Sequence, residues 1–287
     1  MARPKKPGPT LRSQWLGQQL RELRESCGLT LDEAGTYLQR DPSMVSRFET
    51  ANYPIRRGDV LALLDLYGVA DETRRKGLIR LSEDIWQKGW WEQYAAGVDP
   101  KFVDHPWLEA RAERICFYYT MIVPGLLQTR AYAETLIRNN PGPYAAEEHF
   151  QGLVDLRMER QRVLDGDDPT RLSAVLDGSV LRRPIGGPEV MRGQLAHLLY
   201  LMGCPTVELR VLPLRVGWHA GLDGAFQLIE MPEPYPEVAY VESLAGRVYV
   251  EEPDAERFAP AYDELWKAAL DSDASAALIS ATMKELS

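Results

Sequence analysis

The chain has 287 residues, of which 45% are hydrophobic and 26% are charged, a composition typical of folded proteins with a sizeable core. No run of about 18 apolar residues, the length that a membrane span needs, occurs in the sequence, and no apolar stretch follows its basic N-terminal residues. We therefore expect a cytoplasmic protein with no membrane partner, and the length predicts two domains.

The charge is unevenly distributed along the chain. Residues 1–80 contain 14 Lys and Arg against 10 Asp and Glu, which leaves 19 of the 33 basic and 32 of the 42 acidic residues for the remainder. The N-terminal part thus has a formal charge of +4 and the remainder one of −13. This asymmetry indicates two functions, and only the N-terminal part is suited to approach a polyanion.

The first predicted element is a helix with one apolar stripe. Leu16, Leu20, Leu23 and Cys27 recur at intervals of four, three and four residues, and Gly28 is a natural stop. Two short helices follow. Thr30 with Glu33 has the spacing of a capping box, and Asp41 can cap a third helix with Pro42 at its first position.

The third predicted helix, "PSMVSRFE", has an inner and an outer face. Val45 and Phe48 lie three residues apart and are expected to pack on the first two helices. The outer side then carries Ser43, Met44, Ser46 and Arg47. Small polar residues and an arginine on the second helix of such a pair are suited to reading base edges in the major groove. Asp59 is expected to cap a fourth helix that ends at Gly68.

This N-terminal segment also resembles a known motif. "LGQQLRELRESCGLTLDEAGTYLQRDPSMVSRFET" is similar to the XRE-type helix-turn-helix of phage repressors. The resemblance implies that Pro42, Ser43 and Arg47 face bases, with Met44 and Ser46 close by, and that Phe48 and Glu49 are structural. The sequence departs from the pattern at Leu31, where a glutamine is common, and at Gln39, where the turn usually has a glycine.

Phosphate contacts are expected around this helix pair. The candidates for the DNA backbone are Thr30, Arg40, Arg56 and Arg57, which lie at the start of the second helix, in the turn and after the third helix. Each arginine could equally be a solvated surface charge. The DNA-binding domain is expected over residues 1–70, and residues 71–104 are expected to form a helical and aromatic connector, with a dense aromatic segment at 86–94.

The second half of the chain, residues 105–287, is expected to be an α+β domain. Its pattern is helical over residues 105–162 and again at 254–287. Between these, "RLSAVLDGSVL", "TVELRVLPL", "GAFQLIEM", "VAYVES" and "RVYVEE" read as strands bounded by Gly and Pro, and "PIGGPEVMRGQLAHLLYLM" reads as a helix. The fold class is therefore a mainly α helix-turn-helix bundle followed by an α+β domain.

A second resemblance covers this half. "VPGLLQT", "VLDGSVLRRPIGGPEVMRGQLAHLL", "VLPLRVGWHAGLDGAF" and "VAYVESLAGRVYVEEP" are similar to the large domain of unknown function that follows an XRE motif in many actinobacterial regulators. Members of that family are described as antitoxin-like regulators encoded beside a small partner protein. The resemblance thus implies such a partner.

The sequence offers no catalytic or cofactor motif. The four His and the three Cys have no spacing of metal ligands or disulfides, and no phosphate-binding loop or nucleophile elbow is present. We expect no enzyme activity, no metal and no cofactor, so the C-terminal domain is expected to bind a ligand. Aromatic walls with a few polar groups suit such a site, and the candidates are Trp90, Trp91, Tyr118, Tyr119, Gln128, Arg182, Arg183 and His219. Each of these could instead be a core or interface residue.

These observations favour a sequence-specific transcriptional regulator that binds a double-stranded DNA operator as a homodimer and senses a small-molecule effector or a small protein through its C-terminal domain. The alternative is an antitoxin-like protein that mainly binds a small partner and regulates its own operon. An enzyme fused to a DNA-binding module is disfavoured because the catalytic constellation is missing.

Overall fold

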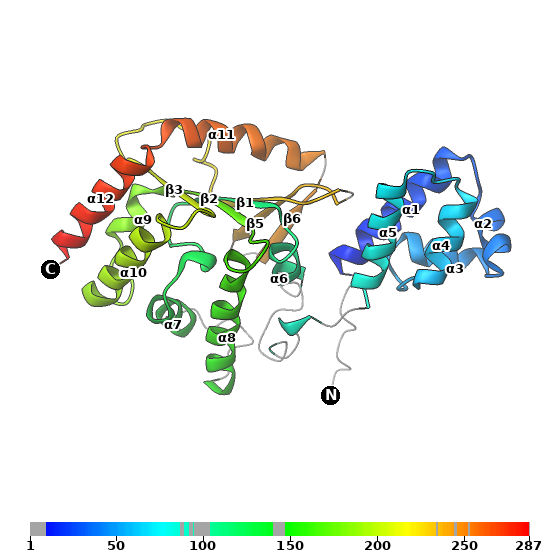
Figure 1. The fold of residues 1–287 in the computed structure, drawn as a ribbon, viewed down its shortest axis with the longest axis horizontal. Helices are drawn as coiled ribbons and strands as arrows, with labels where there is room; N and C mark the ends of the chain where they lie inside the picture. Colours follow the sequence, from blue (N-terminus) through cyan, green and yellow to red (C-terminus); the bar gives the residue numbers. More distant parts are fainter. Residues whose placement is uncertain are drawn as a thin grey trace. The chain divides into compact units, whose positions relative to one another are not determined.

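The computed structural model describes residues 10–86, 89–91, 94, 104–139, 147–233, 235–243, 246–251 and 253–286. The chain forms two compact units. The N-terminal unit comprises Met1–Glu92 with Glu233–Tyr235, and the C-terminal unit comprises the rest of the chain. Figure 1 shows that the first unit is helical and that the second contains the sheet.

The N-terminal unit is a bundle of helices around an aliphatic core. Its helices are α1 (Leu11–Ser26), α2 (Leu31–Leu38), α3 (Pro42–Glu49), α4 (Arg57–Leu66) and α5 (Glu72–Asp84). The stripe predicted for the first helix is confirmed at Leu16, Leu20 and Leu23, which are buried. It is wrong at Cys27, which lies at the C-cap and is exposed. Val45 and Phe48 of α3 are buried as well, which leaves the other side of that helix to solvent.

Two of the three predicted helix starts are confirmed. The Thr30 hydroxyl accepts a hydrogen bond from the backbone of Glu33, whose carboxylate accepts one from the Thr30 backbone in return. The Asp41 carboxylate accepts from the backbone nitrogen of Ser43. The prediction that Asp59 caps the fourth helix is wrong. α4 begins at Arg57, with Arg56 at the cap position and no side-chain cap. The Asp59 carboxylate lies inside the helix and accepts hydrogen bonds from Arg40 instead.

The C-terminal unit combines one mixed sheet with helices. The strands are β1 (Arg114–Tyr119), β2 (Arg171–Asp177), β3 (Val207–Leu212), β4 (Phe226–Glu230), β5 (Val238–Ser243) and β6 (Gly246–Val250). The helices are α6 (Asp104–Glu109), α7 (Arg130–Asn139), α8 (Glu147–Arg160), α9 (Gly178–Arg182), α10 (Pro188–Leu201), α11 (Phe258–Ala268) and α12 (Ser272–Glu285). The predicted fold class is confirmed.

The strands lie in the order β3-β2-β1-β4-β5-β6. β1 is parallel to β2, which is parallel to β3, whereas β4, β5 and β6 form antiparallel pairs in the other half of the sheet. The central strand β1 corrects the helical prediction for residues 105–162. "RICFYY" is buried on both sides, so it lacks the alternation of polar and apolar residues that marks a half-buried strand.

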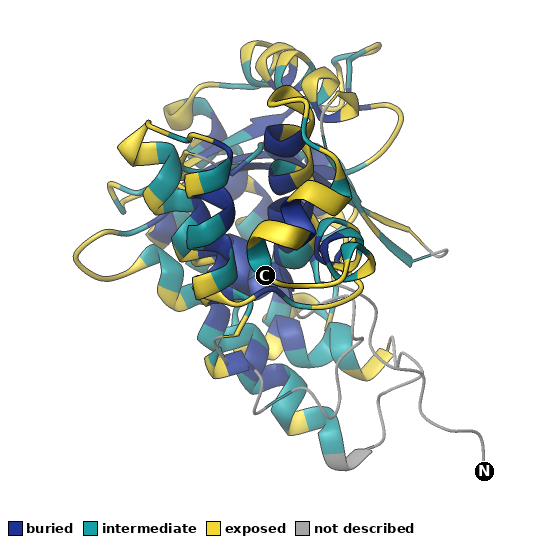
Figure 2. Cartoon of the chain, turned by 90° about the vertical axis from the view of Figure 1, so that its right-hand side faces the viewer, coloured by how far each residue is buried: buried dark blue, intermediate teal, exposed yellow. Residues whose placement is uncertain are grey.

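Helices cover both faces of this sheet. α11 lies along one face (Figure 1), where Tyr262 and Leu265 pack on Cys116, Tyr118 and Leu228. The other face is covered by α6 and α8, and it carries Phe117 and Tyr119 of β1. The burial colours of Figure 2 show the same division, with the exposed residues on the outer sides of the helices. Because neighbouring residues of a strand point to opposite faces, Tyr118 and Tyr119 belong to different layers.

The edge of the sheet at β3 is closed by the C-terminal helices. The backbone nitrogen of Val211 donates to the Ser275 hydroxyl, and the Val211 carbonyl accepts from the backbone of Leu270. These contacts occupy backbone groups that an open edge would expose to other chains. None of the helices within the described ranges is both long and apolar enough to cross a membrane.

Candidate functional site

The connection between α2 and α3 is a tight turn with a strained residue. Gln39 has φ 55° and ψ 42°, the left-handed conformation that favours glycine. The backbone nitrogen of Arg40 donates to the Gly35 carbonyl at 2.8 Å. A Cβ atom at Gly35 would lie 2.9 Å from the Arg40 carbonyl oxygen, so the turn requires glycine at that position. Gln39, where the motif usually has a glycine, therefore adopts a conformation that suits glycine, and its side chain adds strain to the turn.

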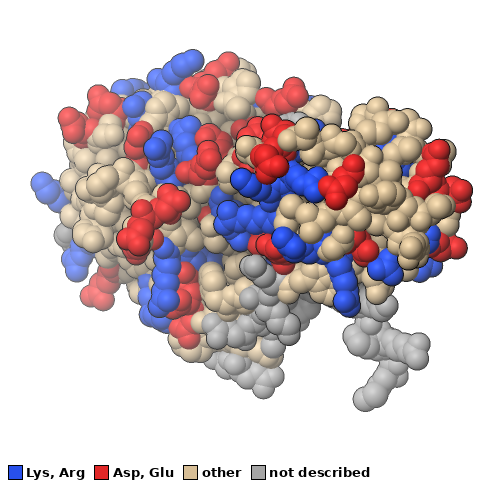
Figure 3. Space-filling model, turned by 45° about the vertical axis from the view of Figure 1, so that its right-hand side comes forward, with Lys and Arg blue, Asp and Glu red and all other residues tan. Residues whose placement is uncertain are grey.

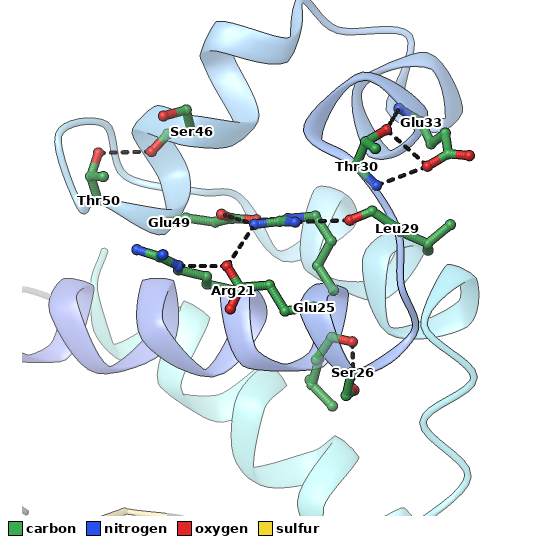
Figure 4. A network of polar contacts seen from close by, with 11 residues as sticks. Arg21, Glu25, Ser26, Leu29, Thr30, Glu33, Ser46, Glu49 and Thr50 are labelled. Atoms are coloured by element: carbon green, nitrogen blue, oxygen red, sulfur yellow. Dashed lines mark hydrogen bonds and ion pairs between the residues drawn. The ribbon is translucent and has the colours of Figure 1, made fainter.

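A buried ion pair fixes α3 to α1. The Arg24 guanidinium donates to both carboxylate oxygens of Glu49, at 2.7 and 2.9 Å, and to the Leu29 carbonyl at 2.8 Å (Figure 4). The two side chains are only 10% and 6% exposed. The hydrogen bonds to Glu49 raise the pKa of Arg24, in spite of partial desolvation. Glu49 is thus structural, as the resemblance implies.

The backbones of these two helices also approach each other closely. A Cβ atom at Gly17 of α1 would lie 2.5 Å from the Glu49 carbonyl oxygen and 2.7 Å from that of Phe48. Such distances leave no room for any other residue. Together with the ion pair, this contact determines how α3 is held on α1, and therefore which of its side chains face outward.

The outward face of α3 carries the five residues predicted to read bases. Ser43 and Arg47 are exposed, whereas Pro42, Met44 and Ser46 are partly exposed. Within the described part of the chain, the Arg47 guanidinium makes no hydrogen bond or ion pair. Its five N–H donors thus remain accessible to a ligand. The structure brings these residues together on one surface of one helix.

The side chains predicted to contact phosphates differ from Arg47, because they already interact with other residues of the chain. The Arg40 guanidinium donates to Asp59 at 3.2 Å, Arg57 pairs with Glu83 at 2.8 Å, and the Arg56 guanidinium lies 5.9 Å from the centre of the Trp86 ring. All three arginines are exposed but have intramolecular partners. Thr30 uses its hydroxyl for the helix cap. Figure 3 shows charges of both signs interspersed on the face that it draws.

Two exposed aromatic residues near the helix pair were not predicted as site residues. Tyr37 of α2 is 52% exposed, and Tyr53, which follows α3, is 50% exposed. The Tyr53 ring packs 6.2 Å from that of Phe48, and its backbone nitrogen donates to the Arg47 carbonyl. Large aromatic side chains at a protein surface are a signal for contacts with a partner, and their position beside α3 could have been read from the predicted helices.

The eight residues predicted to form a ligand pocket do not gather in one place. Trp90 and Trp91 belong to the N-terminal unit. In the C-terminal unit, Tyr118 lies in the layer of α11 and has its ring 5.9 Å from that of His219. Arg182 and Arg183 are exposed, and Arg183 donates to the Met121 sulfur. Tyr119 and Gln128 lie in the opposite layer.

That opposite layer contains a buried polar network. The Arg160 guanidinium donates to both oxygens of the Glu109 carboxylate, at 2.7 and 2.5 Å, and the His105 ring lies 3.3 Å from the same carboxylate. Burial lowers the pKa of His105 and outweighs the opposing effect of Glu109. The pKa of Glu109 is lowered to about 2, because the charge of Arg160 overcomes desolvation. The pair is thus ionised and the imidazole is neutral at pH 7.

One more arginine belongs to this layer. Arg157 of α8 is partly exposed, and its Nη1 donates to the Gln128 side-chain oxygen at 2.9 Å. Gln128 in turn donates to the Val123 carbonyl at 2.7 Å, so its orientation is fixed. Burial, followed by repulsion from Arg160, lowers the pKa of Arg157 to about 10. The side chain therefore stays charged at neutral pH. Sequence reasoning missed Arg157 because nothing distinguishes it from the other arginines of an amphipathic helix.

Two family models match the chain. The model described as "Domain of unknown function (DUF5753)" covers residues 102–281, which is more than half of the chain. The protein belongs to the DUF5753 family. The other model, described as "Helix-turn-helix domain", covers residues 15–76 of this DUF5753 protein, and these residues contain α2, the turn and α3. No curated protein and no solved structure matches the chain.

The DUF5753 protein offers no cluster of metal-ligating residues in the part that the structure describes. Its free thiols are also dispersed, with Cys116 buried and Cys27 exposed. Burial raises the pKa of the Cys116 thiol to about 12, so this side chain is a poor nucleophile at neutral pH.

Proposed function

We propose that the protein is a sequence-specific transcriptional regulator of the XRE type, which binds duplex DNA through α3. The observation that supports this most directly is the outward face of α3, which carries the unpaired Arg47 guanidinium together with Ser43 and Ser46. Arginine pairs in bidentate fashion with the major-groove edge of guanine, and hydroxyls contact bases or phosphates. The proposed function is binding and not catalysis, and it implies a cytoplasmic location.

The experiment is a selection of bound sequences from a random duplex library by the full chain, followed by titrations on the selected duplex. Arg47→Ala should weaken binding by about 1–3 kcal/mol and relax the preference at one base pair. Arg47→Lys is the informative second variant, because lysine keeps the charge but loses the bidentate geometry. It should retain nonspecific affinity and still lose the preference.

Arg80→Ala, on the exposed side of α5, is the matched control and should bind like the wild type. Selection of no sequence, or unchanged affinity and preference in both Arg47 variants, would contradict the proposal. Tyr37→Phe and Tyr53→Phe extend the test to the two aromatic residues, because each removes only a hydroxyl.

We also propose that the regulator acts as a homodimer on a palindromic site. One bundle reads only a few base pairs, and paired recognition helices about 34 Å apart gain affinity by binding two half-sites. Sedimentation of the saturated DNA complex should show two chains per duplex, and the selected sequence should contain two inverted half-sites. A single chain per duplex at saturation would refute the dimer without affecting the assignment of α3.

The proposed role of the C-terminal unit is to receive a signal. An effector can shift DNA binding only if it prefers one of two arrangements of the chain, and operator DNA must then change effector affinity by the same factor. The resemblance to antitoxin-like regulators makes a small protein encoded nearby the alternative source of this signal. Purification of the chain from its native cells would recover such a protein as a stoichiometric partner.

A further inference from the structure

Asp41, at the start of α3, is an acidic residue beside the surface assigned above to DNA. Its carboxylate caps the helix by accepting from the Ser43 backbone nitrogen at 2.8 Å, and both residues are exposed. In a helix that reads the major groove, the residues at the N-terminal end contact the base edges. If α3 binds DNA as proposed, the Asp41 carboxylate therefore lies within reach of a base.

The capping role alone does not require an acid at this position. Serine and asparagine cap helices about as well as aspartate does, and neither would bring a negative charge close to the phosphates of DNA. The helix dipole favours an acid at a helix start, but an exposed group gains little from it. A carboxylate on a DNA-binding surface thus costs affinity, and a gain in discrimination between bases can offset that cost.

The Asp41 carboxylate has acceptor sites that the cap does not use. Ser43 is its only hydrogen-bonding partner among the described residues, and no basic side chain there forms an ion pair with it. Hydrogen bonds from Ser43, helped by the charge of Arg47, lower the pKa of Asp41, so the side chain is ionised at neutral pH. An ionised carboxylate accepts hydrogen bonds at about four positions and donates none.

Arg47 has the opposite hydrogen-bonding character, because a guanidinium only donates. It follows Ser43 by four residues, a spacing that places both on the same side of the helix, and Ser43 holds the Asp41 carboxylate at the end of that side. In the major groove, guanine offers two acceptors, whereas cytosine and adenine offer an amino group. One face of α3 thus combines a side chain suited to guanine with a side chain suited to an amino-bearing base.

We propose that Asp41 is a further base-reading residue of the DNA site, whose carboxylate accepts a hydrogen bond from the exocyclic amino group of a base. Cytosine is the best match, because the amino group of adenine adjoins a ring nitrogen that is itself an acceptor. The acceptors of guanine and thymine repel the carboxylate, so these bases are excluded. This inference rests on the proposed function, and it specifies one part of the sequence that α3 recognises.

The experiment compares the wild type with Asp41→Asn in the selection from the random library and in titrations on the selected duplex. Asparagine keeps the cap and adds a donor group. It should reduce discrimination at one position by about fivefold or more, while the preference due to Arg47 remains. It should also bind an unselected duplex more tightly than the wild type, because a charge that repels phosphates is gone.

Asp71→Asn is the matched control. Asp71 is exposed and caps α5 in the same way, by accepting from the Arg74 backbone nitrogen at 2.6 Å, but it lies on another helix. This variant should select the same sequence as the wild type. Circular dichroism verifies that each variant is folded, and Asp41→Ser, which also keeps a capping group, carries the comparison if Asp41→Asn is not.

A change in the DNA tests the same contact from the other side. Replacement of the selected cytosine by a pyrimidinone analogue without the amino group should weaken binding of the wild type and of Asp71→Asn by similar factors. Asp41→Asn should lose less affinity, because it depends less on the amino group. If the analogue acted only by weakening the base pair, all three proteins would lose affinity equally.

Two results would overturn the role of Asp41 and leave α3 as the reading helix. One is an unchanged preference of Asp41→Asn at every position of the selected sequence, and the other is an equal loss of affinity for the analogue in all three proteins. If the full chain selects no sequence, the proposed function fails as well.

Discussion

The carboxylate of Glu49 is nearly inaccessible to solvent, and both of its oxygens are occupied by Arg24. Glu49→Gln removes one partner of a buried pair and leaves the other charge uncompensated. We expect this change to destabilise the N-terminal unit by about 3 kcal/mol. Hydrogen exchange of the amides in α1 and α3 measures the loss directly, because it reports each segment of a chain that contains two units.

Glu25→Gln is the control for this prediction. The Glu25 side chain is half-exposed and accepts from Arg21 at 2.8 Å and from Arg24 at 3.4 Å. It lies at the surface of α1, where ion pairs contribute little. The substitution should leave exchange in α3 unchanged. Equal protection in both variants would mean that the buried pair does not hold α3 on α1.

At the scale of elements, the turn between α2 and α3 contains strain that a substitution can release. Gln39→Gly should stabilise the N-terminal unit by up to about 1 kcal/mol, because glycine adopts a left-handed conformation without the cost that other residues incur. Gly28→Ala is the reciprocal test. Gly28 has φ 69°, and a Cβ atom built there has no other atom within 4 Å. The substitution therefore changes only the conformational preference of the backbone. It should destabilise by a similar amount in the same exchange measurement.

The network that joins α6 to α8 predicts a loss of stability in acid. The folded-state pKa of His105 lies below its unfolded value, so its contribution is complete above about pH 6.5 and decreases as the pH falls through that value. The pKa of Glu109 is lowered to about 2, and its contribution is lost in the same direction between about pH 4.5 and 2.

Replacement of the imidazole tests the first of these two steps. His105→Gln should flatten the decrease in melting temperature between pH 7 and 5, whereas His149→Gln, on the partly exposed side of α8, should leave it unchanged. An identical pH profile in wild type and His105→Gln would exclude His105 as its source.

The elements also differ in how far the sequence predicts them. The helices of the bundle follow from local signals, namely the cap at Thr30, the cap at Asp41 and the spacing of Leu16 and Leu20. β1 could not be predicted in the same way, because a strand buried on both faces has a continuous apolar pattern that short sequence windows also attribute to helices. Its position in the sheet depends on pairing with residues far away in the sequence.

The same reasoning applies to the candidate ligand site. Tyr119 and Gln128 were predicted from residue type, and they do lie in one layer. The prediction places Tyr118 in the same site, because it interprets "RICFYY" as a helix. In a strand, neighbouring residues point to opposite faces, so Tyr118 lies on the other side of the sheet. The Arg157 side chain donates a hydrogen bond to Gln128, which lies 29 residues earlier in the chain, and only tertiary packing brings the two residues together. No local pattern marks such a contact.

At the scale of the whole molecule, the net charge of −9 conceals a basic N-terminal part, and this predicts a steep salt dependence of DNA binding. If each of two bundles neutralises about three phosphates, the slope of log K against log salt is about −5. Affinity for the selected duplex should then fall on the order of 10³-fold between 50 and 200 mM salt. Titrations at four or more salt concentrations give the slope. A slope near zero would mean that few phosphates are contacted.

The order of strands in the sheet also determines when its central strand can pair during synthesis on the ribosome. Arg114 of β1 pairs with Glu230 of β4, which the ribosome adds 116 residues later. At translation rates of about 5–20 residues per second, the central strand waits on the order of ten seconds for this neighbour. Helices α1 to α5 are all synthesised by then, and their contacts with one another are closer in sequence, so they can pack first. During that interval the growing chain exposes an apolar strand with an open side, which makes β1 the segment where chaperones are expected to act first.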